Sequence, residues 1–160
     1  KLNEIKNFNK KLAKFGKFDS FIHLSSPKIN LKRFYEYPWG EYEKHINVQL
    51  RSVHIIIQSM IKKNMISDNF KFFILSSAAT QRIPPKGMAP YILTKLILEK
   101  YFGILKNELT TKNISIFVLN PKAFESPLHK NIPKNFLIKD KKESLKQISQ
   151  TIEFIKKKLN

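Results

Sequence analysis

The sequence predicts an α/β fold organised on a parallel sheet, and the sheet looks like half of a doubly wound arrangement. Three short apolar runs, at residues 18–24, 71–75 and 114–119, have the length and composition of buried strands. Helical periodicity occupies the chain before, between and after these runs. Because alternating strands and helices imply parallel pairing through crossover connections, we expect three parallel strands with flanking helices.

Each helical segment carries apolar residues at spacings of three and four. The first helix is expected to stop at Gly16, and the third to begin around Pro90. The long second helix is apolar on more than one side, which indicates a packing partner in addition to the core. The four helices are predicted over residues 2–15, 39–63, 91–111 and 143–159.

The connections are polar or marked by proline. Irregular segments are expected at 27–38, 80–90 and 121–142, and the last of these is a candidate lid over a site. The far edge of the first strand has no partner in these residues, so the first βαβ half of the sheet is missing. We expect one domain over residues 1–160 that is part of a longer product.

The composition narrows the possible classes of protein. The chain has 160 residues, of which 42% are hydrophobic, as in a globular domain that buries a core. It has no cysteine, which excludes disulfides and thiolate zinc sites. Its histidines lack the spacing of metal ligands, and no metal is expected. No apolar run approaches the roughly 20 residues that span a bilayer, and a cytoplasmic location is expected.

The formal net charge of +18 raises the possibility of a nucleic-acid partner. However, the basic residues are nearly all lysine and are spread over every segment; the arginines are Arg33, Arg51 and Arg82. Surfaces that read phosphates and bases tend to use the bidentate fork of arginine. The charge pattern therefore favours a solvated surface, and we expect neither a nucleic-acid partner nor a membrane partner.

Tyr91 and Lys95 are the candidate chemical pair. Four residues apart in a helix, their side chains lie on the same face. A cation beside a phenol favours the phenolate, so the tyrosine pKa is expected to fall from about 10. Such a tyrosine can pass a proton to or from a substrate oxygen.

Four other residues lie at the ends of strands or within a helix around this pair. A serine ends the strand before Tyr91, an asparagine lies within the preceding helix, and a proline and a serine follow the third strand. In this order the residues resemble the active site of the short-chain dehydrogenase/reductase family, of the classical type, over about residues 2–159. The residues that carry the resemblance are Asn47, Ser77 (or its neighbour Ser76), Tyr91, Lys95, Pro121 and Ser126.

The resemblance implies a Rossmann-like fold and a catalytic set of four residues. Ser77 would donate a hydrogen bond to the substrate carbonyl, and Tyr91 would exchange the proton at that oxygen. Lys95 would lower the tyrosine pKa and hold the ribose of the cofactor. Asn47 would disturb its helix locally and hold a water molecule that carries protons onward.

The resemblance also implies NAD or NADP as cofactor and a small carbonyl or alcohol substrate. A homodimer or homotetramer through the 39–63 and 91–111 helices is implied as well. The glycine-rich turn that cradles the pyrophosphate in this family does not occur in the sequence. The chain is therefore expected to be a fragment, or a relative that cannot hold a dinucleotide. The cofactor-binding residues implied are Ser25, Ser26, Tyr91, Lys95, Pro121, Phe124 and Ser126.

Two alternatives remain open at this point. The run His23-Leu24-Ser25-Ser26 and the position of Glu99 are similar to the extended branch of the family, which modifies sugar nucleotides as epimerases or dehydratases. The short gap from Ser77 to Tyr91 favours the classical branch, and Glu99 is then most simply a helix charge near lysines. The other alternative is a non-catalytic remnant or scaffold that keeps the fold without binding a cofactor.

Overall fold

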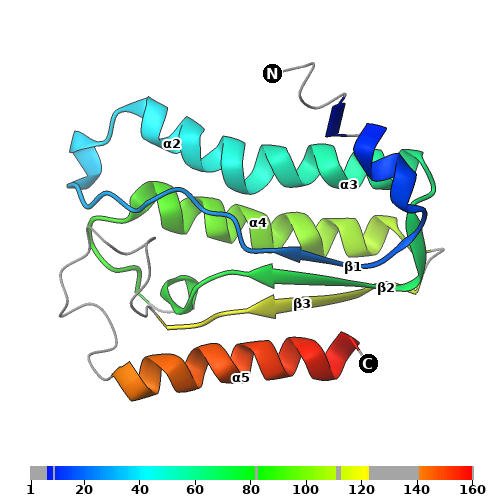
Figure 1. The fold of residues 1–160 in the computed structure, drawn as a ribbon. Coiled ribbons are helices and arrows are strands. Elements are labelled where there is room, and N and C mark those ends of the chain that lie inside the picture. The colour runs from blue at the N-terminus through cyan, green and yellow to red at the C-terminus, as the bar shows by residue number, and fades with distance from the viewer. Residues whose placement is uncertain (1–6, 9, 82, 111–112, 123–140, 160) are drawn as a thin grey trace.

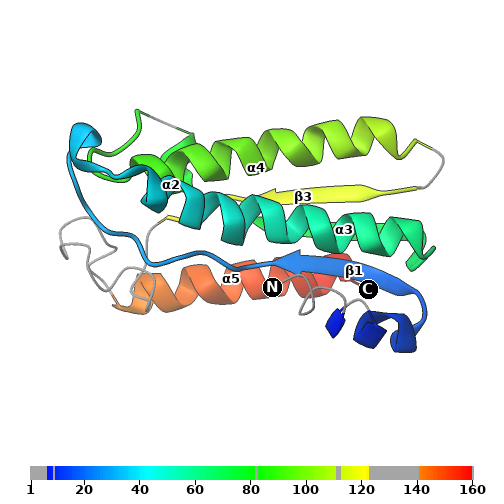
Figure 2. The same cartoon turned by 90° about the horizontal axis from the view of Figure 1, so that it is seen from above.

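A computed structural model describes residues 7–8, 10–81, 83–110, 113–122 and 141–159, and these form three layers. A parallel sheet lies in the middle, with helices α2, α3 and α4 on one face and α5 on the other (Figure 1). The view from above shows α3 and α4 side by side over the sheet (Figure 2). This is the doubly wound arrangement that the alternation of strands and helices predicts.

The sheet has the order β1-β2-β3 and both pairings are parallel. Its strands are β1 (Phe18–His23), β2 (Ile66–Leu75) and β3 (Ser115–Leu119). The central strand β2 is rich in aromatic and β-branched residues and is buried on both faces. Successive side chains of β2 point to opposite faces of the sheet: Phe72 packs against Phe102 of α4, whereas Phe73 stacks on Phe117 of β3.

Two strands differ from their predicted form. β2 begins at Ile66, five residues before the predicted start, because the polar stretch around Asn69 joins the strand through an irregular turn with positive φ at Asn69. β1 is only half-buried, with Ile22 exposed, because among the described residues it pairs on one side only. The predicted position of β1 is otherwise confirmed.

The long helix predicted over 39–63 is present but is not uniform. It consists of α2 (Trp39–Ile46), a π-helical segment η3 (Asn47–Arg51) and α3 (Ser52–Lys62). A π turn accommodates one extra residue, so the face that an α-helical period predicts is rotated after it. The helix ends where Asn64 adopts a positive φ.

Helix α4 (Ala89–Glu108) has Pro90 in its first turn, as predicted. Before β1, the described residues include a short 3-10 helix, η1 (Ala13–Phe15), which Gly16 ends with a φ of 74°. Phe15 and Leu12 belong to one helical spacing of apolar residues, but Phe15 is exposed and Leu12 packs on the core.

Helix α5 (Lys141–Leu159) covers the second face of the sheet, and Phe154 meets Phe117 edge-on. The apolar spacing of this helix predicts that Leu145, Ile152 and Ile155 face inward; Leu145 and Ile152 are exposed, while Ile155 is half-buried. Strand β3 has 5 residues and α5 has 19, so the described sheet is shorter than the helix that runs along it. The periodicity therefore identifies the helix correctly but overestimates how much of it is buried.

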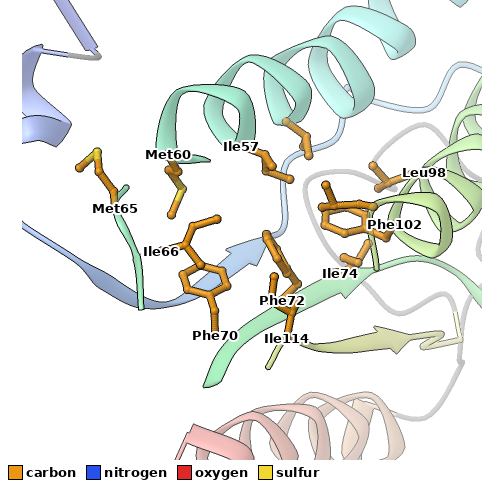
Figure 3. Close-up of a cluster of buried hydrophobic side chains, with 12 residues drawn as sticks. Ile57, Met60, Met65, Ile66, Phe70, Phe72, Ile74, Leu98, Phe102 and Ile114 are labelled. Carbon is orange, nitrogen blue, oxygen red and sulfur yellow. The ribbon is translucent and has the colours of Figure 1, made fainter. Parts of the chain in front are cut away.

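The main core lies between β2 and the helices α3 and α4. Figure 3 shows its side chains converging from α3, from α4 and from β2. Phe70, Phe72 and Phe102 are fully buried there, and their rings pack edge-on or tilted against one another. No helix in the described part of the chain is long and apolar enough to cross a membrane.

Replacing Phe102 by alanine tests this core. The ring is 0% exposed and joins α4 to β2, so its loss leaves a cavity and should cost about 3–5 kcal/mol in the free energy of unfolding. Ile104→Ala on the same helix is the control, because Ile104 is 60% exposed and should cost under about 1 kcal/mol. Urea unfolding measures both, and equal costs would contradict this placement of the core.

Candidate functional site

The carboxyl end of β2 and the first turns of α4 bring three of the four predicted catalytic residues together. Ser77 follows β2 and begins the short 3-10 helix η4 (Ala78–Thr80). Its hydroxyl oxygen accepts a hydrogen bond of 3.2 Å from the Ala79 amide and also bonds the Tyr91 phenol. The amide takes one of the two lone pairs of the hydroxyl oxygen and leaves its proton available to be donated toward the phenol oxygen.

The neighbouring serine has a different partner. The Ser76 hydroxyl donates to Oε1 of Glu99, and the Thr80 hydroxyl donates to the same oxygen at 2.8 Å. Thr80 Oγ1 also lies 2.8 Å from the Ser77 carbonyl oxygen. Glu99 therefore anchors the turn that carries Ser77, and Ser77 rather than Ser76 meets Tyr91.

Lys95 is almost completely buried one helical turn from Tyr91. Its ammonium donates a 2.6 Å hydrogen bond to the carbonyl oxygen of Leu75, the last residue of β2. Burial lowers the pKa of Lys95 to about 8, while the negative charge of Glu99 opposes that decrease. The ammonium lies 5.7 Å from the centre of the Tyr91 ring, so the two side chains share a helix face as predicted.

The predicted direction of the tyrosine pKa is wrong for this structure. Burial raises the pKa of Tyr91 above its ordinary value of 10, and the hydrogen bond with Ser77 opposes that rise. Lys95 does not offset the burial because its ammonium is directed to the Leu75 carbonyl. The phenol is thus held as a neutral proton donor, which is the form needed to protonate a carbonyl oxygen.

Asn47, the fourth predicted residue, does not join this group. Its side chain is exposed, and its Oδ1 accepts a 3.4 Å hydrogen bond from Arg51. The polar residue that the helix buries is Gln49, whose amide Nε2 lies 3.1 Å from Nδ1 of His45. The His45 ring in turn meets the Tyr91 ring edge-on, with centroids 6.2 Å apart.

A signal for His45 and Gln49 exists in the sequence but is easily missed. Counting back in steps of four from the core residues Val53 and Ile57 reaches Gln49 and then His45. An α-helical period instead selects Ile46, because the π turn at η3 is invisible in the residue pattern.

Gln49 Oε1 is buried without a hydrogen-bond partner among the described residues. An unsatisfied buried acceptor costs about 1–3 kcal/mol. His23, at the end of β1, likewise has an unpartnered buried Nε2. Burial, assisted by the charge of Lys95, lowers the pKa of His23 to about 4, so this imidazole is neutral at pH 7.

The residues predicted to contact a cofactor lie partly within the described chain. Ser25 and Ser26 follow β1 at the same edge of the sheet, and the Ser26 hydroxyl donates a hydrogen bond of 3.3 Å to the Pro27 carbonyl oxygen. Pro121 follows β3, and its carbonyl oxygen accepts from the Ala78 amide at 2.9 Å. Phe124 and Ser126 lie outside the described residues.

A groove of about 970 Å³ adjoins the start of α4. Gly87 permits the two loops that line the groove to meet. Its φ of 83° favours glycine, and a Cβ added to it would lie 3.4 Å from the Lys32 carbonyl oxygen. The Tyr37 hydroxyl bonds the carbonyl oxygens of Asn30 and Gly87 and so joins the same loops. The lining comes from residues 31–36, 84–87, 89, 92, 93 and 96. In the described chain no group of acidic, histidine or cysteine residues could hold a metal.

The comparisons with known proteins bear on the family and the fold of the chain. Residues 3–155 match a family model described as "Enoyl-(Acyl carrier protein) reductase", which covers nearly the whole chain. No curated protein matches the sequence at a significant level.

Solved structures give the same fold at low sequence identity. A short chain dehydrogenase family protein from Francisella tularensis has a TM-score of 0.72 and 16% identity, covering 85% of this chain and 54% of that protein. A 3-ketoacyl-(acyl-carrier-protein) reductase from Brucella melitensis, complexed with NADH, has a TM-score of 0.70 and 23% identity, covering 85% and 58%. A short chain dehydrogenase from Burkholderia cenocepacia, in complex with NADP, has a TM-score of 0.67 and 18% identity, covering 78% of this chain and 50% of that protein.

The chain thus spans about half the length of the solved structures that it matches. Its family model, its three-layer parallel fold and its serine, tyrosine and lysine at the carboxyl end of β2 lead to one assignment. The chain belongs to the short-chain dehydrogenase/reductase family.

Proposed function

We propose that this chain is the catalytic half of an NAD(P)-dependent oxidoreductase that reduces a carbonyl group or oxidises an alcohol. The observation that supports this most directly is the meeting of Ser77 and Tyr91, with Lys95 one turn along the same helix. These groups combine a hydrogen-bond donor, a neutral proton donor and a buried cation at the edge of a parallel sheet where ligands bind.

In the reductive direction the protein residues handle the proton. Ser77, oriented by the Ala79 amide, donates a hydrogen bond to the substrate carbonyl oxygen. Tyr91 gives its proton to that oxygen as negative charge develops there, and the Lys95 ammonium stabilises the phenolate that forms. The nicotinamide, when bound, supplies the hydride. Oxidation of an alcohol is the reverse of these steps.

The residues present fit one end of such a cofactor. Ser26, Lys95 and Pro121 all lie at the carboxyl edge of the sheet, where a nicotinamide and its ribose could be held. The sequence contains four glycines, none in a glycine-rich turn of the kind that approaches a pyrophosphate. This chain therefore accounts for the reacting end of the cofactor and not for the phosphates.

We also assign to Gln49 the polar role that the family resemblance gave to Asn47. Gln49 is buried beside His45 and retains an unpartnered acceptor, whereas Asn47 faces solvent with Arg51. A buried acceptor of this kind is suited to hold a water molecule that returns protons toward Tyr91 and Lys95. The π segment supports the assignment, because η3 carries Gln49 and packs against α4.

The oxidoreductase and scaffold hypotheses differ in whether the full-length protein, meaning the longest product that the gene encodes, binds and oxidises a nicotinamide cofactor. An oxidoreductase quenches or shifts NADH or NADPH fluorescence on binding and oxidises that cofactor in the presence of a carbonyl substrate. A scaffold does neither. Screening both cofactors against a panel of ketones and aldehydes separates the two.

Tyr91→Phe tests the proton donor. Removing the hydroxyl leaves no acid at the carbonyl oxygen, so we expect kcat/KM for carbonyl reduction to fall by about 100-fold or more. The matched control is Tyr101→Phe on the same helix, whose hydroxyl bonds His54, and it should retain activity within about twofold. If Tyr91→Phe kept full activity, another residue would have to be the acid.

Glu99→Gln tests the anchor of the serine turn. The negative charge of Glu99 raises the Lys95 pKa, so its removal should lower that pKa further below about 8. Glu99→Leu should also release Ser76 and Thr80, and we expect kcat to fall about tenfold more than in Glu99→Gln. NMR titration of the Lys95 side chain measures the first effect, with the exposed Glu108→Gln as control. An unchanged Lys95 pKa in Glu99→Gln would refute the electrostatic role.

A further inference from the structure

The pair His45 and Gln49 is a polar contact inside an otherwise apolar helix face. Gln49 is 0% exposed and lies in the π segment η3, while His45 is 2% exposed one turn earlier on α2. Leucine or methionine at both positions would fill the same space without burying any polar atom. A buried polar pair in such a place therefore calls for a role beyond packing.

The contact fixes the orientation of the Gln49 amide. Its Nε2 lies 3.1 Å from Nδ1 of His45, and a carboxamide nitrogen can only donate. Nδ1 must then be the unprotonated acceptor of a neutral imidazole, with the ring proton on Nε2. Oε1 is consequently turned away from His45, and it has no partner among the described residues.

The surroundings keep His45 in that neutral form. Burial lowers the pKa of His45 to about 4; the carboxylate of Glu41 opposes the decrease, and the charges of Lys44 and Lys95 assist it. The ring edge also rests against Tyr91, which is buried and uncharged. A neutral imidazole between these groups presents the same acceptor to Gln49 throughout the physiological pH range.

We propose that His45 is a positioning residue that locks the Gln49 amide through Nδ1, so that Oε1 remains a buried acceptor, turned away from His45, for the proton path to Tyr91. His45 itself does not touch the substrate. Its role rests on the proposed oxidoreductase function for its effect on rate, but the locked amide and the imidazole tautomer do not depend on that function. If His45 were lost, the amide could rotate and present its NH₂ group where an acceptor is needed.

The tautomer of His45 gives a direct test that needs no substitution and no activity. In the ¹⁵N-labelled full-length protein at pH 7, long-range ¹H–¹⁵N correlation spectra should show the His45 ring protonated at Nε2 alone. The Gln49 side-chain NH₂ should show one proton shifted by its hydrogen bond to Nδ1. A His45 ring protonated at Nδ1 would overturn the proposal, because that ring nitrogen would then require Oε1 of Gln49 as its acceptor.

Kinetics separate positioning from packing. His45→Phe keeps the size of the ring and its contact with Tyr91, and we expect kcat to fall about tenfold with KM changed by less than about twofold. His45→Asn restores an acceptor and should recover part of the lost kcat. His54→Phe, an exposed histidine on α3, is the matched control and should leave kcat unchanged. Equal loss in His45→Phe and His45→Asn, or no loss in either, would contradict the positioning role.

The two proposals fail in different ways. A full-length protein that neither binds a dinucleotide nor reduces a carbonyl would refute the oxidoreductase function while the Nε2 tautomer of His45 could still be observed. An active enzyme whose His45 carries its proton on Nδ1 would refute the positioning role alone.

Discussion

The ammonium of Lys95 against the Leu75 carbonyl is the contact on which the site depends. It joins the last residue of β2 to the first turns of α4, so the serine that follows β2 and the tyrosine one helical turn earlier share one location. A buried cation is costly, and here a neutral carbonyl and a nearby carboxylate are what compensate for the lost hydration. The chain therefore accepts an electrostatic cost at this point, which is a common mark of a functional site.

Glu99 gives this arrangement its second support. One carboxylate oxygen receives the hydroxyls of Ser76 and Thr80, while its charge acts on Lys95 one turn away. The turn after β2 and the buried cation are thus coupled through a single side chain. In the sequence Glu99 looks like an ordinary helix charge, and only the closeness of the β2 turn to α4 makes it part of the site.

The sequence predicts the order and type of the elements well, because apolar spacing reports directly on secondary structure. It locates Ser77, Tyr91 and Lys95 correctly in relation to one another, since the strand end and the helix start determine where each lies. Three features escape it for physical reasons. The family resemblance points to Asn47, whereas the π turn in η3 buries Gln49, which an α-helical period does not select. The rise in the Tyr91 pKa follows from burial, which a sequence does not reveal. The exposure of Ile22 and Leu145 depends on which neighbours cover each layer.

The groups to which we assign proton transfer form a continuous set within this chain. Gln49 contacts His45, and the His45 ring meets the Tyr91 ring. Tyr91 in turn interacts with Ser77 and lies beneath the Lys95 ammonium. Hydride transfer, by contrast, belongs to a cofactor whose phosphates this chain gives no glycine-rich turn to hold. The residues for the acid–base half of the proposed reaction are therefore held in place by packing around Lys95 and Glu99, without that turn.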